Sequence, residues 1–461
     1  MIIEETELRA SPEELFAFLR DRPGSFLLDS AQSSGGLGTH SYIGFDPFLE
    51  FRASGTAITI TQGSATETLS GDPLDALRPL LARHRCPPGS PLPFSGGAVG
   101  YVSYELCALL DRIPRARSGG LSIPDVALDF HDGVLAHDLR TGRWSIVANP
   151  VAGRSADEIL GRMRAVIAAF RAAPPPAGLP RRIPAPGTEP TSNFSKAEYL
   201  QCIGRIKDYI RSGDVYQVNL SQRFEAPLAC HPYALYRRLR SLSPAPFACY
   251  LNHGDLQVAG SSPERFLRIR ERRIETRPIK GTRPRGATPA EDARLAAELM
   301  ASEKDRAELL MIVDLERNDL GRVCDYGTVA VDEIFRLETH PTVHHLVASV
   351  SGKIRPNFDV LDCIRALFPG GSITGAPKIR AMQIIDEIET RRRDLYTGAI
   401  GYLGFDGNCD LNIAIRTISC AGGRAYYHAG GGIVWDSDPE AEYQETLDKA
   451  RAMRQALAEA C

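Results

Sequence analysis

Residues 399–434 read AIGYLGFDGNCDLNIAIRTISCAGGRAYYHAGGGIV. The segment up to Phe405 is rich in apolar and aromatic residues, and the Asp-Gly pair at 406–407 is typical of a hairpin turn. Residues 411–420 are therefore expected to return as a second strand, and residues 425–434 form a third. Tight turns connect antiparallel strands, because a parallel pair needs a longer crossover. This stretch predicts an antiparallel sheet.

Helices alternate with such strand pairs through the second half of the chain. Ser195 and Glu198 form a capping box that opens a helix, whose apolar face continues until Gly213. A strand at residues 215–224 follows, and residues 256–259 are expected to pair with 265–269. Further helices are expected from Thr288, from Ser302 to about Asp314, and over 359–367. Hairpins interspersed with helices predict an α+β fold with antiparallel sheets and helices outside.

A proline-rich segment divides the chain. Residues 173–190 contain seven prolines, which sustain neither a helix nor a central strand. We interpret this segment as a linker between an N-terminal region, 1–172, and a catalytic domain, 191–461. In the first part, helices are expected near 11–19 and 156–170, and strands at 57–61 and 144–148.

Composition excludes several classes of function. The 461 residues are 43% hydrophobic and 24% charged with a net charge of −3, so no broad basic field for nucleic acid is expected. The N-terminus lacks the pattern of a signal peptide and no apolar run is long enough to cross a membrane, which predicts a cytoplasmic protein without membrane contact. The ten cysteines include no C-x-x-C pair. We expect reduced thiols, with neither a zinc site nor a disulfide framework.

Lys280 stands in RPIKGTRPRG, residues 277–286, between an apolar segment and a glycine. An amine with a reference pKa of ~10.4 must have its pKa lowered by roughly 3 units to act as a nucleophile near neutral pH. Burial or the adjacent Arg277, Arg283 and Arg285 could lower it. The alternative is a solvated cation in a basic turn.

Two helical segments carry acidic pairs spaced three residues apart. These are Asp305 with Glu308, and Glu442 with Glu445, and each pair lies on one helical face. Four carboxylates brought together would repel one another unless a hard cation such as Mg²⁺ lay between them. The alternative is an ordinary helix salt bridge between Glu445 and Lys449.

Glycine-rich turns and two further polar groups are also candidates. Residues 429–434 could direct backbone N–H groups toward a carboxylate, whereas 368–378 lacks the ending of a nucleotide-binding loop. Glu264 precedes a strand that leads toward Lys280, so acid and amine could face one site; an ion pair with Arg265 is the alternative. One of His344 and His345 is expected to face inward if that segment is a strand.

Together these segments resemble the chorismate-utilising enzymes. The motifs occur in the family's order at residues 214–220 (DVYQVNL), 262–266 (SPERF), 278–282 (PIKGT), 311–315 (MIVDL), 317–319 (RND), 369–378 (PGGSITGAPK), 430–432 (GGG) and 441–446 (AEYQET). In the first part the match is thinner and rests on 94–101 (FSGGAVGY) and 27–30 (LLDS). The resemblance implies two packed antiparallel sheets with helices outside.

Two positions make the chain most similar to the aminodeoxychorismate synthase branch of that family. Anthranilate synthases typically carry alanine where this chain has Lys280, and the water-activating lysine of isochorismate and salicylate synthases is replaced by Gln217. The resemblance implies a transferase in which neutral Lys280 attacks ring carbon 2 of chorismate while Glu264 protonates the departing 4-hydroxyl. Ammonia then enters at carbon 4 and the lysine leaves. Glu264 must start protonated, so its pKa should be raised.

The resemblance also implies how substrate and metal are held. Mg²⁺ would be held chiefly by Glu308 and Glu445, with Asp305 and Glu442 close behind. The ring carboxylate would lie at Gly431, Gly432 and Lys449, and Arg416 with Tyr402 would hold the enolpyruvyl carboxylate. Residues similar to those lining the ring in the family are Thr282, His345 and Thr374.

Partners follow from the same resemblance. The chain contains no glutamine-hydrolysing module, so ammonia is expected from solution or from a separate glutamine amidotransferase subunit in a heterodimer. The product would pass to a lyase for 4-aminobenzoate and folate. Leu28 and Ser30 are similar to the family's tryptophan pocket, with a core strand end as the alternative. The alternative functions are anthranilate synthase component I and a non-catalytic module that senses tryptophan or chorismate.

Overall fold

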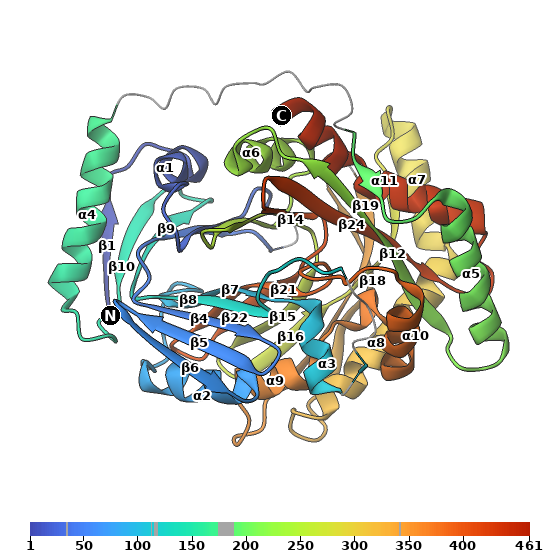
Figure 1. The fold of residues 1–461 in the computed structure, drawn as a ribbon, viewed down its shortest axis with the longest axis horizontal. Helices are drawn as coiled ribbons and strands as arrows, with labels where there is room; N and C mark the ends of the chain where they lie inside the picture. The colour runs from blue at the N-terminus through green and yellow to red at the C-terminus, as the bar shows by residue number, and fades with distance from the viewer. Residues whose placement is uncertain (34–35, 112, 115–118, 174–188, 341–342) are drawn as a thin grey trace.

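The computed structural model describes residues 1–33, 36–111, 113–114, 119–173, 189–340 and 343–461. Its described strands form two sheets of twelve strands each, and all of their pairings are antiparallel. Figure 1 shows the two sheets stacked, with helices around them. The predicted α+β architecture is confirmed. Residues 174–188 of the proline-rich segment lie outside the described part.

The first sheet takes strands from both sides of the proline-rich segment. Its order is β1 (Ile2–Thr6), β10 (Trp144–Ala148), β9 (Gly133–Asp138), β3 (His40–Gly44), β2 (Ser25–Asp29), β13 (Phe247–Asn252), β14 (Leu256–Ser262), β23 (Thr417–Ala421), β24 (Arg424–Ile433), β12 (Gln217–Pro227) and β11 (Thr191–Ser192), with β20 (Gly375–Ala376) beside β12. The junction between the two parts of the chain is the β2–β13 pair.

The second sheet has the same mixed origin. Its order is β17 (Ile279–Pro284), β19 (Val343–Lys353), β16 (Arg273–Arg277), β15 (Arg265–Arg270), β22 (Cys409–Ile413), β21 (Ala399–Gly404), β7 (Gly97–Val102), β8 (Val126–His131), β4 (Leu49–Ser54), β5 (Ala57–Gln62) and β6 (Ala65–Ser70), with β18 (Ala330–Thr339) beside β19. Here the junction is the β7–β21 pair.

The described helices cover the outer faces of the sheets. They are α1 (Pro12–Leu19), α2 (Pro73–Arg83), α3 (Cys107–Leu110), α4 (Ala156–Ala172), α5 (Lys196–Arg211), α6 (Pro232–Leu242), α7 (Pro289–Ala301), α8 (Glu303–Gly321), α9 (Val360–Leu367), α10 (Lys378–Ile388) and α11 (Pro439–Ala460). Helices α6 and α11 contact the first sheet and α8 the second. The capping box predicted for α5 is present, since Ser195 Oγ accepts from Glu198 N.

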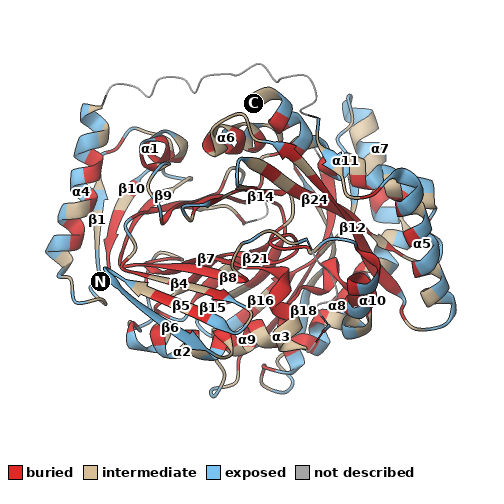
Figure 2. Cartoon of the chain, viewed as in Figure 1, coloured by how far each residue is buried: buried red, intermediate tan, exposed pale blue. Residues whose placement is uncertain are grey.

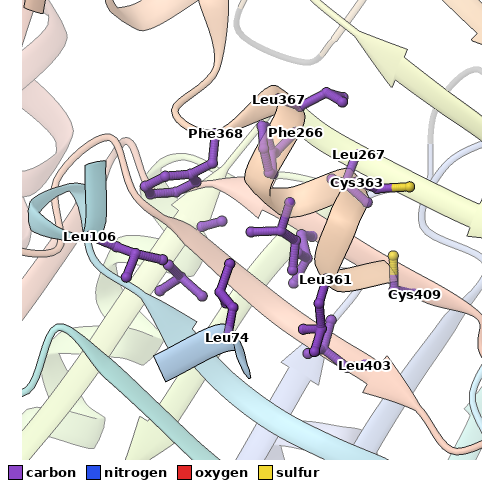
Figure 3. Close-up of a cluster of buried hydrophobic side chains, with 14 of the residues drawn as sticks. Leu74, Leu106, Phe266, Leu267, Leu361, Cys363, Leu367, Phe368, Leu403 and Cys409 are labelled. Atoms are coloured by element: carbon purple, nitrogen blue, oxygen red, sulfur yellow. The ribbon is translucent and has the colours of Figure 1, made fainter. Parts of the chain in front are cut away.

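Buried apolar residues form clusters between the sheets and on their outer faces. In Figure 2 most of the strands are red, which marks buried residues. One cluster lies between the sheets and includes Phe26 of β2, Val99 of β7 and Val258 of β14. Figure 3 shows a second cluster, in which α9 packs on the second sheet; it labels Leu361, Cys363 and Leu367 of α9 with Phe266 and Leu267 of β15 and Leu403 of β21. These contacts give the sheets the rigid packing that positions the candidate site.

Two strand predictions are wrong for one reason, which is that the chain changes sheets. The hairpin of β21 and β22 is confirmed, but the strand expected over 411–420 breaks at Arg416, where φ is +49°. Its first half belongs to the second sheet and its second half, β23, to the first. Likewise β14 and β15 do not pair, because the chain between them crosses from the first sheet to the second.

The prediction that the cysteines are all reduced is also wrong. Cys230, just before α6, forms a disulfide with Cys461 at the end of α11. The two positions are separated by 231 residues, so no local spacing indicates the pairing. The eight other cysteines are free thiols, and all but one of them are buried.

Within the described residues, no helix combines the length and the apolar character needed to span a membrane.

Candidate active site

The two sheet crossings lie side by side and place Glu264 and Arg416 together. Ser262 Oγ donates to Ile413 O at 2.6 Å, and Ile413 N donates to Glu264 O at 3.0 Å. Ser261 N donates to Arg416 O at 3.0 Å. The two connections are thus hydrogen-bonded to each other, which fixes an acid and a guanidinium between the sheets.

Glu264 is 5% exposed, and its carboxyl group has two hydrogen-bond donors. Ser372 Oγ donates to Oε1 at 2.7 Å and Ile279 N donates to the same oxygen at 3.3 Å. Burial raises the pKa of Glu264 above its ordinary value, although these bonds and the nearby Lys280 oppose the shift. The expected direction of the shift is confirmed, and the protonated form is favoured. Ser372 was not predicted as a site residue.

Lys280, on β17, directs its amine toward the same residues. Its Nζ donates to Ser372 O at 3.1 Å. Burial lowers the pKa of Lys280, Lys449 lowers it further, and Glu308 and Glu264 oppose the shift. Ser372 therefore joins the two groups, since its carbonyl oxygen accepts from the amine and its hydroxyl donates to the acid.

The three neighbouring arginines are not among the main causes of the lowered pKa of Lys280, and each of them pairs with a carboxylate. Arg277 pairs with Glu338, Arg283 with Asp305 and Glu298, and Arg285 with Asp292. The cation that does act on the Lys280 amine is Lys449, on α11. The pKa of Lys280 is lowered, as predicted, but the main causes are burial and Lys449 rather than the three arginines.

Glycine at position 432 gives the Gln217 side chain its space beside the Lys280 amine. A Cβ atom on Gly432 would lie 2.1 Å from Gln217 Nε2 and 3.5 Å from Lys280 Nζ. Gln217 is 1% exposed, and its Oε1 has no hydrogen-bond partner among the described residues. We call Lys280, Glu264, Ser372, Gln217 and Gly432 the Lys280 cluster.

Three further predicted residues form a polar group beside this cluster. Thr282 Oγ1 and His345 Nδ1 are 2.9 Å apart, and both His345 and its neighbour His344 are buried. Burial and the charge of Arg416 lower the pKa of His345 well below its ordinary value, so its imidazole is neutral. The pKa of Arg416 is lowered by burial, and no carboxylate of the described residues forms an ion pair with it. An unpaired guanidinium of this kind is suited to a carboxylate ligand.

Four acidic residues from α8 and α11 approach the same region, and we call Asp305, Glu308, Glu442 and Glu445 the carboxylate cluster. Burial raises the pKa of Glu308, and repulsion by Asp305 and Glu442 adds to it. Although burial opposes it, Lys449 at 2.6 Å lowers the pKa of Glu445. A Cβ atom on Gly431 would lie 3.1 Å from Glu442 Oε2, so the first turns of α11 rest against β24.

The carboxylate cluster contains a suitable donor set for Mg²⁺, because all of its ligands would be carboxylate oxygens from two facing helices. The described residues nevertheless include no group of three or more acidic, histidine or cysteine side chains arranged to hold a metal ion. The cluster is balanced instead by Lys304, Lys449 and Arg283.

Two predicted substrate residues take other positions. Thr374 is fully buried, and its Oγ1 donates to Gly370 O at 3.0 Å within its own loop. Tyr402 donates to Pro93 O at 3.2 Å, and none of its described contacts is with Arg416. The prediction that Tyr402 and Arg416 together hold the enolpyruvyl carboxylate stays a prediction.

Tyr402 instead lines a cavity of about 290 Å³ together with Leu28 and Ser30. Ser30 Oγ donates to His40 O at 2.6 Å, and Arg265 and Asp410 pair at 2.9 Å on the opposite wall. The residues expected for a tryptophan pocket therefore border a real cavity.

Tyr396 is a candidate that sequence reasoning missed. It is 9% exposed, its ring stacks on His428 with centroids 4.9 Å apart, and burial raises its pKa above the ordinary value. The charge of Glu264 also raises the pKa of the Tyr396 hydroxyl. Two tyrosines six residues apart carry no sequence signal that tells which one faces the site.

Comparison with known proteins agrees with this geometry. Residues 26–455 match the family model described as chorismate binding enzyme. Anthranilate synthase component 1 of Streptomyces coelicolor is 42% identical, over 97% of this chain and 86% of that protein. Aminodeoxychorismate synthase component 1 of Bacillus subtilis is 39% identical, over 95% and 92%. The crystal structure of anthranilate synthase component I from Streptococcus pneumoniae superposes with a TM-score of 0.79 at 32% identity, covering 90% of this chain and 92% of that one. The chain belongs to the chorismate-binding enzyme family.

Proposed function

We propose that this chorismate-utilising enzyme is component I of an aminodeoxychorismate synthase, which converts chorismate and ammonia to 4-amino-4-deoxychorismate. The observation that carries the proposal is the Lys280 amine, whose pKa is lowered and which is linked through Ser372 to a buried acid, Glu264, of raised pKa. A neutral amine opposite a protonated carboxyl group has the protonation states that displacement of a hydroxyl group requires.

In the proposed reaction, Lys280 Nζ forms a bond to ring carbon 2, the ring electrons shift, and the bond from carbon 4 to its hydroxyl breaks. Glu264 gives its proton to that hydroxyl, which leaves as water. Ammonia then forms a bond at carbon 4 as the bond from Lys280 to carbon 2 breaks and the lysine leaves as the neutral amine. The new ammonium group at carbon 4 gives one proton to the Glu264 carboxylate, which restores the acid. Ser372 holds both groups in place throughout, because it bonds to each of them.

Binding of the two substrate carboxylates is assigned to different residues. Arg416, with Thr282 and neutral His345 beside it, would hold the enolpyruvyl carboxylate. The ring carboxylate would lie at Gly431, Gly432 and Lys449. Glu308 and Glu445, supported by Asp305 and Glu442, would hold Mg²⁺, which when bound offsets the charge of that carboxylate.

Ammonia would be delivered by a glutamine amidotransferase subunit. The relatives in Streptomyces coelicolor and Bacillus subtilis are each named component 1, which implies a second component in those systems. We propose a heterodimer of the same kind here, with the product used for 4-aminobenzoate and folate. The 290 Å³ cavity beside Leu28 and Ser30 is a candidate site for tryptophan.

Anthranilate synthase component I is the second candidate, because a protein of that name is as similar to this chain as the aminodeoxychorismate synthase is. Incubation of the purified chain with chorismate, Mg²⁺ and ammonium, followed by chromatography and mass analysis, tests the choice. The proposal predicts a non-aromatic aminodeoxychorismate with its enolpyruvyl group retained. Fluorescent anthranilate with released pyruvate would establish the second candidate, and chorismate left unchanged would contradict both.

A further inference from the structure

Lys304 lies in the first turn of α8 and spans the gap between the two helices of the carboxylate cluster. Its Nζ is 3.6 Å from Glu442 Oε1, on α11, and 4.0 Å from Glu308 Oε1, on its own helix. Glu442 is buried and Glu308 half-buried, with side chains 6% and 16% exposed, whereas the Lys304 side chain is 52% exposed. A half-exposed cation thus lies between solvent and two carboxylates that are less exposed.

The other cations of the cluster are held by bonds of their own. Lys449 pairs with Glu445 at 2.6 Å and also donates to Gly430 O at 3.0 Å. Arg283 bridges Asp305 on α8 and Glu298 on α7. Of the three, only Lys304 connects a carboxylate of α8 with a carboxylate of α11.

We infer that Lys304 occupies the place of the divalent cation in the metal-free protein and that its side chain moves toward solvent when Mg²⁺ binds. The inference rests on the proposed Mg²⁺ site. The ammonium group of Lys304 and a Mg²⁺ ion held by Glu308 and its neighbours would repel each other and compete for the Glu308 carboxylate. The half-exposed lysine can leave at little cost, since its head group regains water.

Lys304 has a role of its own in the metal-free protein. Glu308 on α8 and Glu442 on α11 repel each other, because the charge of Glu442 raises the pKa of Glu308. A lysine that compensates their charge keeps the helices in place for the metal, and it lowers the metal affinity by competing with it. Lys304 therefore sets the Mg²⁺ concentration at which the site fills.

Calorimetric titration of Mg²⁺ into the intact chain is the first measurement. We expect Lys304→Gln to bind Mg²⁺ about two- to fivefold more tightly than wild type, the effect of removing one partly exposed ion pair. Lys304→Arg keeps the charge and should stay near wild type. Lys196→Gln is the matched control, because Lys196 is 53% exposed and pairs at 2.6 Å with Glu440 on α11, outside the carboxylate cluster.

The second measurement tests whether Mg²⁺ displaces the Lys304 side chain, which a change in Mg²⁺ affinity after removal of the Lys304 charge does not show by itself. Wild-type protein is treated briefly with an amine-acylating reagent, with and without saturating Mg²⁺, and its peptides are quantified by mass spectrometry. We expect acylation of Lys304 to increase severalfold with Mg²⁺ while that of Lys196 is unchanged. Unchanged or reduced acylation of Lys304 would overturn the inference even if Lys304→Gln binds Mg²⁺ more tightly, and so would the absence of Mg²⁺ binding in every variant. Neither result depends on which product the enzyme makes.

Discussion

At the scale of single residues, the pKa values of Lys280 and Glu264 are shifted in opposite directions by the same cause, which is burial. Burial disfavours a charge on either group, so it lowers the pKa of the amine and raises that of the carboxyl group. Both shifts favour the neutral forms that the proposed reaction needs. One environment therefore prepares a nucleophile and a general acid together.

These shifts predict a bell-shaped dependence of kcat/KM on pH. The rate should be low at acidic pH, where the Lys280 amine is protonated, and low at alkaline pH, where Glu264 is ionised and can no longer donate a proton. The lowered pKa of Lys280 and the raised pKa of Glu264 both increase the fraction of protein in the active form between these limits. Initial rates of chorismate consumption at fixed ionic strength measure both limbs. A profile without a falling limb would exclude Glu264 as the acid.

Replacing Glu264 by Gln is expected to lower kcat about 10²- to 10⁴-fold, the usual contribution of a positioned general acid. The amide still accepts the bond from Ser372 but has no proton of the required acidity. Glu316→Gln is the matched control, because Glu316 is also a buried glutamate, has a pKa raised to about 8 and accepts a bond from Thr276 Oγ1. Steady-state assays of both variants, with near-UV spectra to check the fold, make the comparison. Equal losses in the two variants would contradict the role of Glu264.

At the scale of elements, the site depends on two places where the chain leaves one sheet for the other. Sequence patterns identified most helices and the β21–β22 hairpin, because periodicity and turn residues are local signals. They did not reveal the breaks after β14 and β22. Arg416 takes a left-handed conformation that usually marks a glycine, so nothing in the sequence indicates a turn there. Packing between segments that are distant in the sequence determines where the chain leaves the sheet.

Candidate residues are recognisable in the sequence where a short motif carries them, and not where the direction of a strand decides. Lys280, Glu264 and the acidic pairs of α8 and α11 are recognisable from local motifs, and the structure brings them into one region. Tyr402 and Tyr396 are not distinguished by such a motif, because only the pleat of the sheet and the bend before β21 determine which of them faces Glu264.

The pairing of β12 with β24 predicts a strong effect of Gly432→Ala. The added methyl group would lie 2.1 Å from Gln217 Nε2, which is too close for any contact, so the buried Gln217 side chain must shift. We expect a loss of about 1–3 kcal/mol in the free energy of unfolding and a larger relative loss of kcat/KM. Denaturant titration and initial rates measure the two.

Gly204→Ala, on α5, is the control for that substitution. Nothing lies within 4 Å of a Cβ atom at that position, so activity should be unchanged. If Gly432→Ala retained full activity, the prediction would be contradicted, because catalysis would not require the absence of a side chain at position 432.

At the scale of the whole molecule, both sheets join strands from the two sides of the proline-rich segment. The boundaries 1–172 and 191–461 remain a proposal about sequence organisation. In the structure, β13 pairs with β2 along five residues and β21 pairs with β7 along six. Removal of the first part would expose the edges of both sheets, together with the apolar cluster between them.

We therefore predict that residues 191–461 expressed alone do not unfold cooperatively and do not consume chorismate. Coexpression with residues 1–172 should restore a complex that does both, because the missing strand pairs can form between the fragments. Size-exclusion chromatography with thermal unfolding measures the assembly. A monomeric, active 191–461 fragment would show that the catalytic residues need none of the N-terminal strands.

The central claim is that the Lys280 amine forms a covalent bond to the substrate. Intact-protein and peptide mass spectrometry of the chain, incubated with chorismate and Mg²⁺ in the absence of ammonia and then acid-quenched, tests it most directly. The account predicts a mass increase of one chorismate less one water, located on the peptide that contains Lys280 and absent from Lys280→Ala. Efficient turnover to aminodeoxychorismate by Lys280→Ala, with no adduct in the wild-type protein, would contradict it.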